Sequence, residues 1–144
     1  MTSKRENILD QIKTVLAGTT NVGTRIYRER VTPLTRDESP SLVIEPVRDD
    51  AQQNLTLPKI DWTLSVRVAI IVRGSASNTP YEVADPVCKS LHAKMTSDLT
   101  LGGYAIDVLP TGVDFAMVDG DQAIGVINTN WDVRYRTELT DLST

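Results

Sequence analysis

The sequence predicts an α+β fold in which a mainly antiparallel sheet of about five strands carries two helices on one face. Two segments have helical periodicity, and each opens on a capping box, Ser3 to Glu6 and Thr79 to Glu82. Other segments have the composition or the alternation of strands. The order helix, three strands, helix, two strands favours antiparallel pairing with both helices on one side.

The first helix is expected to run from Ser3 to the neighbourhood of Gly18, because glycine commonly ends a helix. Lys4 and Arg5 near its start are expected to be solvated charges whose reversal has little effect. The apolar residues recur at the spacing of one helical face: Ile8, Leu9, Ile12, Val15 and Leu16.

Two strands are predicted next, over residues 25–31 and 41–47, with Pro33 preventing continuation of the first. Residues 48–59 are expected to form a long polar loop, because they have no hydrophobic period. The loop contains Asp49, Asp50, Gln52 and Gln53. We expect it to be mobile in the free subunit and to become ordered against a neighbouring protein.

The clearest strand covers residues 60–73. Alternate positions on its core face are occupied by Trp62, Leu64, Val66, Val68, Ile70 and Val72. A second helix should begin at Pro80 and bend or restart at Pro86. Its buried residues are expected to be Val87, Cys88, Leu91 and Met95.

The last two strands are predicted over residues 104–118 and 123–138, with a bulge or bend at residues 110–112 and a hairpin turn at Asp119 and Gly120. In the final strand the core face should carry Trp131, Val133 and Tyr135, and the opposite face Asp132, Arg134 and Arg136. A short polar tail follows from about residue 139. Residues 1–144 are expected to form a single domain.

Composition narrows the class of function. The 144 residues are 40% apolar and 24% charged, as in ordinary globular proteins. The net charge of −4 comes from 19 acidic and 15 basic residues that are interspersed, which disfavours a surface dedicated to duplex nucleic acid. The longest apolar run, residues 68–72, is too short to cross a bilayer, and no signal peptide is recognised, so synthesis in the cytoplasm is expected.

The sequence predicts no catalytic residue, no cofactor and no metal site. His92 follows Cys88 by four residues on the predicted helix, but two ligands do not make a metal site, and packing explains both residues better. Cys88 is the only cysteine and should be a buried, reduced thiol. Neither a Gly-x-Ser-x-Gly elbow nor a phosphate-binding loop occurs, and Asp119 to Asp121 lacks the rest of a calcium loop.

Arginines are frequent on the predicted strands, at Arg25, Arg28, Arg30, Arg67, Arg73, Arg134 and Arg136. They fit three interpretations: a solvated sheet face with ion pairs, contacts to carboxylates of another subunit, or contacts to phosphate. Nearby Glu29, Asp132 and Glu138 disfavour phosphate, because they would repel a polyanion.

Three segments taken together resemble the tail terminator, or tail-completion, proteins of long-tailed phages, the group of the lambda minor tail protein U. They are RIYRERV at residues 25–31, LTLGG at residues 99–103 and WDVRYRT at residues 131–137. With the order of the elements, the resemblance covers nearly the whole chain.

The resemblance implies an α+β subunit of the virion that is assembled in the host cytoplasm and performs no catalysis. Such a subunit forms a hexameric ring on the head-proximal end of the tail tube, stops tube polymerisation and joins the tail to the head connector. Its partners would be further copies of itself, the tail tube protein and a head-connector or neck protein. The genome would pass through the ring without specific binding.

A neck or head-closure adaptor is the alternative role, and a small enzyme is a less favoured one. For the assembly role, the interface is predicted to contain Arg28, Arg30, Asp49, Asp50, Gln52, Gln53, Arg134 and Arg136.

Overall fold

The computed structural model describes residues 2–28, 40–53, 58–74, 79–118 and 124–144. The expectations for residues 29–31, Pro33 and the turn at Asp119 lie outside these residues. The described elements are α1 (Lys4–Leu16), β1 (Ile26–Arg28), β2 (Ser41–Gln52), β3 (Lys59–Arg73), α2 (Pro80–Met95), β4 (Asp107–Val118) and β5 (Ile124–Glu138).

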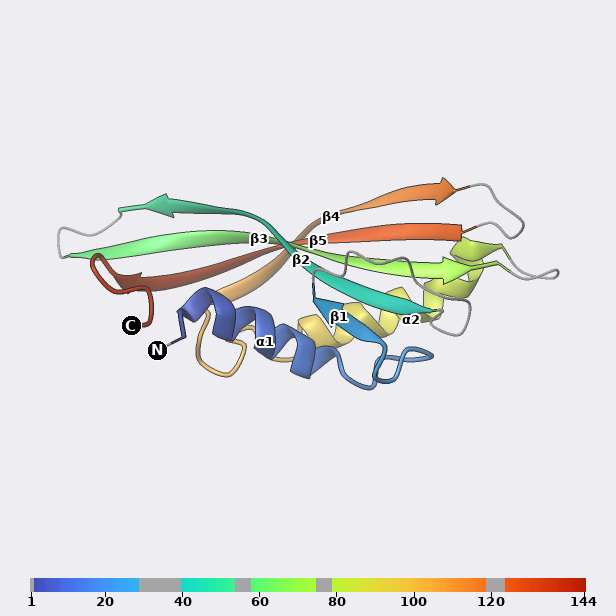
Figure 1. The fold of residues 1–144 in the computed structure, drawn as a ribbon, viewed down its shortest axis with the longest axis horizontal. Coiled ribbons are helices and arrows are strands. Elements are labelled where there is room, and N and C mark those ends of the chain that lie inside the picture. Colours follow the sequence, from blue (N-terminus) through green and yellow to red (C-terminus); the bar gives the residue numbers. More distant parts are fainter. Residues whose placement is uncertain (1, 29–39, 54–57, 75–78, 119–123) are drawn as a thin grey trace.

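The strands form one sheet in the order β1-β2-β3-β5-β4. β1 pairs with β2 in parallel, and every other described pair is antiparallel. Both helices lie on the same side of this strongly twisted sheet (Figure 1). The predicted fold class and the predicted order of elements are therefore confirmed.

The helix α1 begins and packs as its sequence predicts. The Ser3 hydroxyl accepts a hydrogen bond from the backbone N–H of Glu6 at 3.2 Å, which satisfies one of the free donors of the first turn. The helix ends at Leu16, and Gly18 takes a positive φ of 83° that suits glycine. The side chains buried against the sheet are Ile8, Leu9, Ile12 and Leu16.

The central strands β3 and β5 supply most of the sheet's share of the core. On β3, Leu64, Val66, Val68, Ile70 and Val72 are buried, as the alternation predicts, whereas Trp62 is only partly buried at the end of the cluster. On β5, Trp131, Val133 and Tyr135 are buried. The predicted core faces of both strands are therefore correct.

The predicted loop at residues 48–59 is wrong over much of its length. β2 continues to Gln52, and residues 48–52 pair with residues 61–65 of β3. The register shifts between Pro46 and Arg48, so a bulge accommodates the proline, which cannot donate to the ladder. Residues 54–57 lie outside the described part of the chain.

Two further expectations concern proline. The helix α2 runs through Pro86 without restarting, from Pro80 to Met95. The bulge predicted at residues 110–112 is present, because the pairing of β4 with β5 shifts between Pro110 and Gly112. β4 itself begins at Asp107, three residues later than predicted.

The C-terminal tail returns to the first helix. The backbone N–H of Lys4 donates to the carbonyl oxygen of Leu142 at 2.9 Å, and that of Leu139 donates to the carbonyl of Pro58 at 2.7 Å. The two chain ends consequently lie side by side (Figure 1).

Candidate assembly interface

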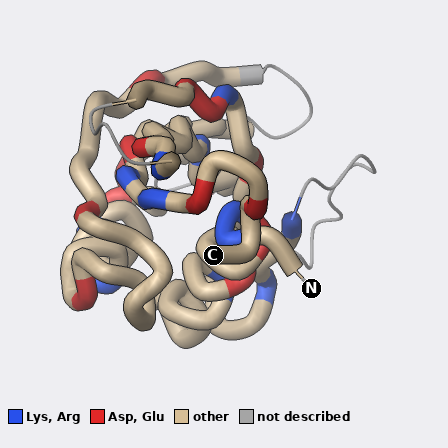
Figure 2. The backbone as a smooth tube through the Cα atoms, turned by 90° about the vertical axis from the view of Figure 1, so that its left-hand side faces the viewer, with Lys and Arg blue, Asp and Glu red and all other residues tan. Residues whose placement is uncertain are grey.

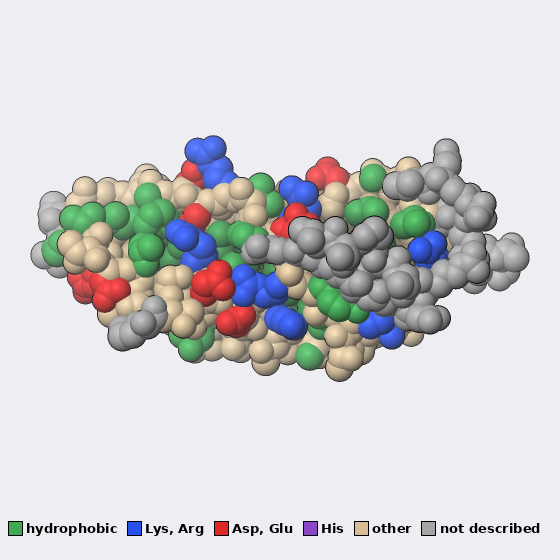
Figure 3. Space-filling view, in the orientation of Figure 1, with side chains coloured by type: hydrophobic (Ala, Val, Ile, Leu, Met, Phe, Trp, Pro, Cys, Tyr) green, Lys and Arg blue, Asp and Glu red, His purple; other side chains and the backbone are tan. Residues whose placement is uncertain are grey.

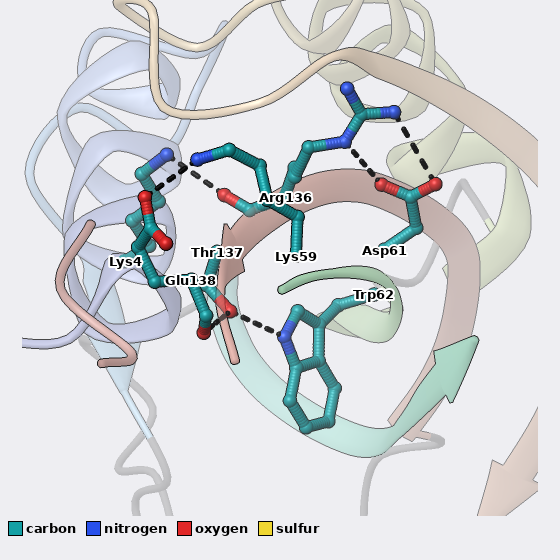
Figure 4. Close-up of polar contacts among 7 residues, drawn as sticks. All are labelled: Lys4, Lys59, Asp61, Trp62, Arg136, Thr137 and Glu138. Carbon is teal, nitrogen blue, oxygen red and sulfur yellow. Dashed lines mark hydrogen bonds and ion pairs between the residues drawn. The ribbon is translucent and has the colours of Figure 1, made fainter. Parts of the chain in front are cut away.

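The sheet face opposite the helices carries cross-strand pairs of opposite charge. Arg136 on β5 donates from Nε to the Asp61 carboxylate on β3 at 2.6 Å, and on this face Lys59 pairs with Glu138, also at 2.6 Å (Figure 4). Arg134 donates from Nε to Asp107 on β4 at 2.9 Å and makes a second bond to the same carboxylate. Facing residues of antiparallel strands are close enough to form such pairs.

Three of the predicted interface residues meet in one hollow on this face. The hollow has a volume of about 200 Å³, and its lining includes Gln52, Asp61, Thr63, Ile106, Arg134 and Arg136. Because these residues belong to β2, β3, β5 and the segment before β4, the hollow depends on the folded sheet. It is the place where the predicted interface residues are most concentrated among the described residues.

The arginines of this hollow are paired within the subunit. They lie on the face opposite Trp131 and Tyr135, as predicted, but the expectation that they are free to reach another protein requires correction. Hydrogen bonding to Arg134 holds the pKa of Asp107 below its usual range, and bonding to the carboxylates raises the pKa of both arginines. The side chains of Arg134 and Arg136 remain 56% and 42% exposed.

Exposed pairs of this kind hold their geometry weakly, since water screens them and ordering the long side chains costs entropy. A carboxylate from another protein can therefore replace or share the internal partner. A guanidinium can also bond two acceptors at once, since it carries five N–H donors.

Asp49 has a structural position instead of the loop position predicted for it. Its carboxylate accepts a hydrogen bond from the Tyr135 hydroxyl and one from Arg5 Nε at 2.7 Å, and its side chain is only 10% exposed. Burial and the bond to Asp49 raise the pKa of Tyr135. Arg5 also lies over the Trp62 ring, 5.8 Å from its centroid, so it is not the inert surface charge expected from the sequence.

The other predicted interface residues are separate from the hollow. Arg28 pairs with Glu6 at 3.1 Å and with Asp10 at 2.8 Å on α1. Asp50 pairs with the exposed Arg48 at 2.5 Å. Gln53 is exposed just after the end of β2, and Arg30 lies outside the described residues.

Basic and acidic residues are interspersed over the described surface. The view along the long axis shows both signs around the end of the molecule (Figure 2), and the space-filling view shows them adjacent near the centre of one face (Figure 3). The face seen in Figure 3 therefore carries mixed charge, as the sequence predicts.

Cys88 and His92 both line a small hollow of about 40 Å³ beside Trp131. The His92 and Trp131 rings lie 5.5 Å apart between centroids. Cys88 is partly buried instead of fully buried, and its pKa is raised by burial and by Asp85, which favours the protonated thiol. Within the described ranges, no three His, Cys, Asp or Glu side chains are grouped so that they could hold a metal ion.

None of the helices in the described part of the chain has the length and apolar character needed to span a membrane.

Asp61, Thr63 and Ile106 also line the hollow and were not predicted from the sequence as interface residues. Asp61 and Thr63 alternate with the core residues of β3, so the sequence pattern places them on the outer face of the sheet. Their positions opposite Arg136 and Arg134 depend on a strand register that no short pattern specifies. Ile106 comes from the turn before β4 and carries no periodic signal.

Comparison with known proteins gives a likeness in fold. No protein-family model matches the chain, and no curated protein matches it. A solved structure titled "Virion of native gene transfer agent (GTA) particle" contains a chain with the same fold, at a TM-score of 0.60 and 12% sequence identity. The alignment covers 94% of this chain and 96% of that chain, so the likeness extends over nearly the whole fold.

Proposed function

We infer that this chain is a structural subunit of a phage or phage-like virion, and that it acts as the ring-forming tail terminator. The observation that carries the proposal is the fold shared, over nearly the full length of both chains, with a chain of a gene transfer agent virion. The three segments that resemble tail terminators support the finer assignment.

The surface of the subunit is suited to such a role. The hollow on the outer sheet face presents two exposed guanidinium groups beside Gln52 and Ile106, so it combines charged, polar and apolar contacts. Interfaces often use arginine in this way, because its planar group bonds carboxylates in a defined geometry.

In the proposed mechanism, copies of the chain form a closed ring, hexameric by the resemblance, on the head-proximal end of the tail tube. One face of the ring binds the last ring of tube protein and leaves no surface for a further tube subunit. The other face binds the head connector or neck protein, and the genome passes through the opening without specific contacts.

The experiment that tests this function is deletion of the gene followed by in vitro complementation with the purified chain. A terminator predicts tubes of uncontrolled length in the deletion and restored tail length and infectivity when the protein is present during assembly. Tails of normal length that cannot join heads would assign the chain to the neck or head-closure adaptor instead. Normal infectious particles in the deletion would contradict both roles.

A further inference from the structure

The outer edge of β4 is the long free edge of the sheet. β4 spans Asp107–Val118 and stands last in the strand order, so no described strand pairs with its outer side. Edge strands leave backbone N–H and C=O groups available to another chain, and proteins that remain monomeric usually protect them with bulges, prolines or charged side chains.

Only the first half of this edge has such protection. Pro110 and the bulge before Gly112 interrupt the first half. From Val113 to Met117 the single charged residue is Asp114, whose carboxylate accepts a hydrogen bond from the Asn130 side chain at 3.0 Å. The second half is therefore a regular strand edge with little charge to oppose pairing.

The same half carries apolar side chains that the helices do not cover. Val113, Phe115 and Met117 face Thr129, Ile127 and Gly125 in the ladder and so lie on the helix side of the sheet. The Phe115 ring contacts Tyr81 of α2 with centroids 5.3 Å apart, yet Phe115 remains 63% exposed, and Val113 and Met117 are each 46% exposed. The apolar face of the sheet thus extends one strand beyond the helical layer.

The opposite edge of the sheet, at the end of β2, has no strand partner within the described ranges. β1 pairs only with residues 42–44 of β2, so residues 47–52 have no strand on their outer side among the described residues. This edge exposes Val47 and Arg48, whose side chain is 74% exposed and pairs with Asp50. It also contains Asp50 and Gln52, two of the predicted interface residues.

The two edges are complementary in strand direction. β2, β3, β5 and β4 are successive antiparallel neighbours, so β4 runs opposite to β2. A second copy in the same orientation therefore offers its β2 edge to β4 for antiparallel pairing. β4 has two carboxylates and no cation, and the one cation on the free edge of β2, Arg48, is paired with Asp50 within the subunit, so strand direction and not charge relates the two edges.

We propose that the free edge of β4 docks on the free edge of β2 in a second copy of this chain, head to tail, so that each copy uses both edges. Backbone hydrogen bonds would continue the sheet, and the apolar residues of β4 would be covered by the second copy. A head-to-tail contact between two different edges closes into a ring when the rotation permits it, unlike a two-fold contact, which stops at a dimer. The inference rests on the proposed function for its ring and deepens it by naming the surfaces that meet.

The first test measures the oligomeric state by native mass spectrometry over a concentration series. Phe115→Lys with Met117→Lys should convert the oligomer to a monomer with an unchanged circular dichroism spectrum. The matched control, Leu99→Lys with Leu142→Lys, adds the same charge at exposed apolar residues away from β4 and should keep the oligomer. An oligomer that survives the Phe115 and Met117 changes overturns the inference.

The second test uses disulfide cross-linking in assembled particles as well as in the purified protein, with Cys88→Ser as background. Phe115→Cys is combined in turn with a cysteine at each of residues 47–52. A ladder of covalent multimers for at least one combination is expected. The absence of cross-links for every combination, or a covalent dimer from Phe115→Cys alone, overturns head-to-tail pairing. Protein present in particles without cross-links would refute this contact alone, whereas protein absent from particles would refute the proposed function.

Discussion

Tyr135 on β5 and Asp49 on β2 are joined by a hydrogen bond from the tyrosine hydroxyl to the carboxylate, and Arg5 of α1 donates to the same oxygen. The three groups connect the start of the first helix to two strands of the sheet. Asp49 therefore stabilises the subunit itself, at the end of the sheet where the Trp62 and Tyr135 rings stack at 6.2 Å between centroids.

Replacing Asp49 by alanine should lower the free energy of unfolding by about 2 to 3 kcal/mol, because it leaves the buried Tyr135 hydroxyl and Arg5 without their acceptor. Denaturant unfolding measures the loss. Asp50→Ala is the matched control, since among the described residues Asp50 pairs with the exposed Arg48 alone, and it should change stability by less than about 0.5 kcal/mol. Equal losses of unfolding free energy in the two variants would show that the bonds of Asp49 to Tyr135 and Arg5 do not stabilise the subunit.

The raised pKa of Tyr135 should make the free energy of unfolding fall at alkaline pH. Its ordinary pKa is 10.0 and is raised in the folded protein, chiefly by burial, so the folded state retains a proton that the unfolded state releases. This contribution is complete below pH 10 and is lost as the pH rises above that value. Unfolding free energies of the native protein and of Tyr135→Phe, compared at pH 8 to 11, should converge with rising pH. A constant difference across the series would refute the coupling.

The core assignment predicts a large cost for shortening Leu91 of α2, which is fully buried. Leu91→Ala should destabilise the protein by about 2 to 5 kcal/mol through lost burial and a cavity, and Trp62→Ala by a similar amount. Leu99→Ala, at a side chain that is 45% exposed, should cost less than about 0.5 kcal/mol. Thermal or denaturant melts that rank Leu99 with Leu91 would mean that the helix packs differently.

Charge reversal in the outer hollow should block assembly without unfolding the subunit. Arg134→Glu with Arg136→Glu should give a soluble protein with nearly unchanged thermal stability that does not restore infectivity to tails lacking the chain. Arg134→Gln with Arg136→Gln should show the same direction without placing like charges beside Asp107 and Asp61. Both outcomes follow because exposed internal pairs contribute little to folding while the guanidinium groups face outward.

Lys13→Glu with Lys89→Glu is the charge-matched control, since both lysines are exposed on the helices. It replaces a reversal at Lys4 and Arg5, because Arg5 bonds Asp49 and contacts Trp62. Normal complementation by the Arg134 and Arg136 variants would leave these arginines as a solvated, ion-paired surface.

The sequence predicted correctly those strands in which apolar and polar residues alternate, because the alternation shows which side chains are buried. Trp62 to Val72 and Trp131 to Tyr135 alternate clearly, and their core faces are correct. Residues 48–52 were taken for a loop because β2 there is an edge with exposed polar side chains and a proline nearby, so no apolar period marks it. It is a strand because residues 61–65 of β3 supply a ladder partner, which is information held elsewhere in the chain.

The sequence predicted which face of the sheet carries the interface arginines, but it did not predict their ion-pair partners. Alternation placed Arg134 and Arg136 on the outer side correctly, whereas their pairing with Asp107 and Asp61 depends on the register of three strands. Asp49 was misplaced for a related reason: the bulge after Pro46 shifts the register, and β2 then presents Asp49 to Tyr135 and Arg5.

Cryo-electron microscopy of complete particles, with the chain located by its fold, would place the subunit directly. We expect a closed ring of this chain at the head-proximal end of the tail tube, with the free edge of β4 in each copy beside β2 of the next. Particles in which the ring at that position is built from another protein, and in which this chain is absent, would contradict it.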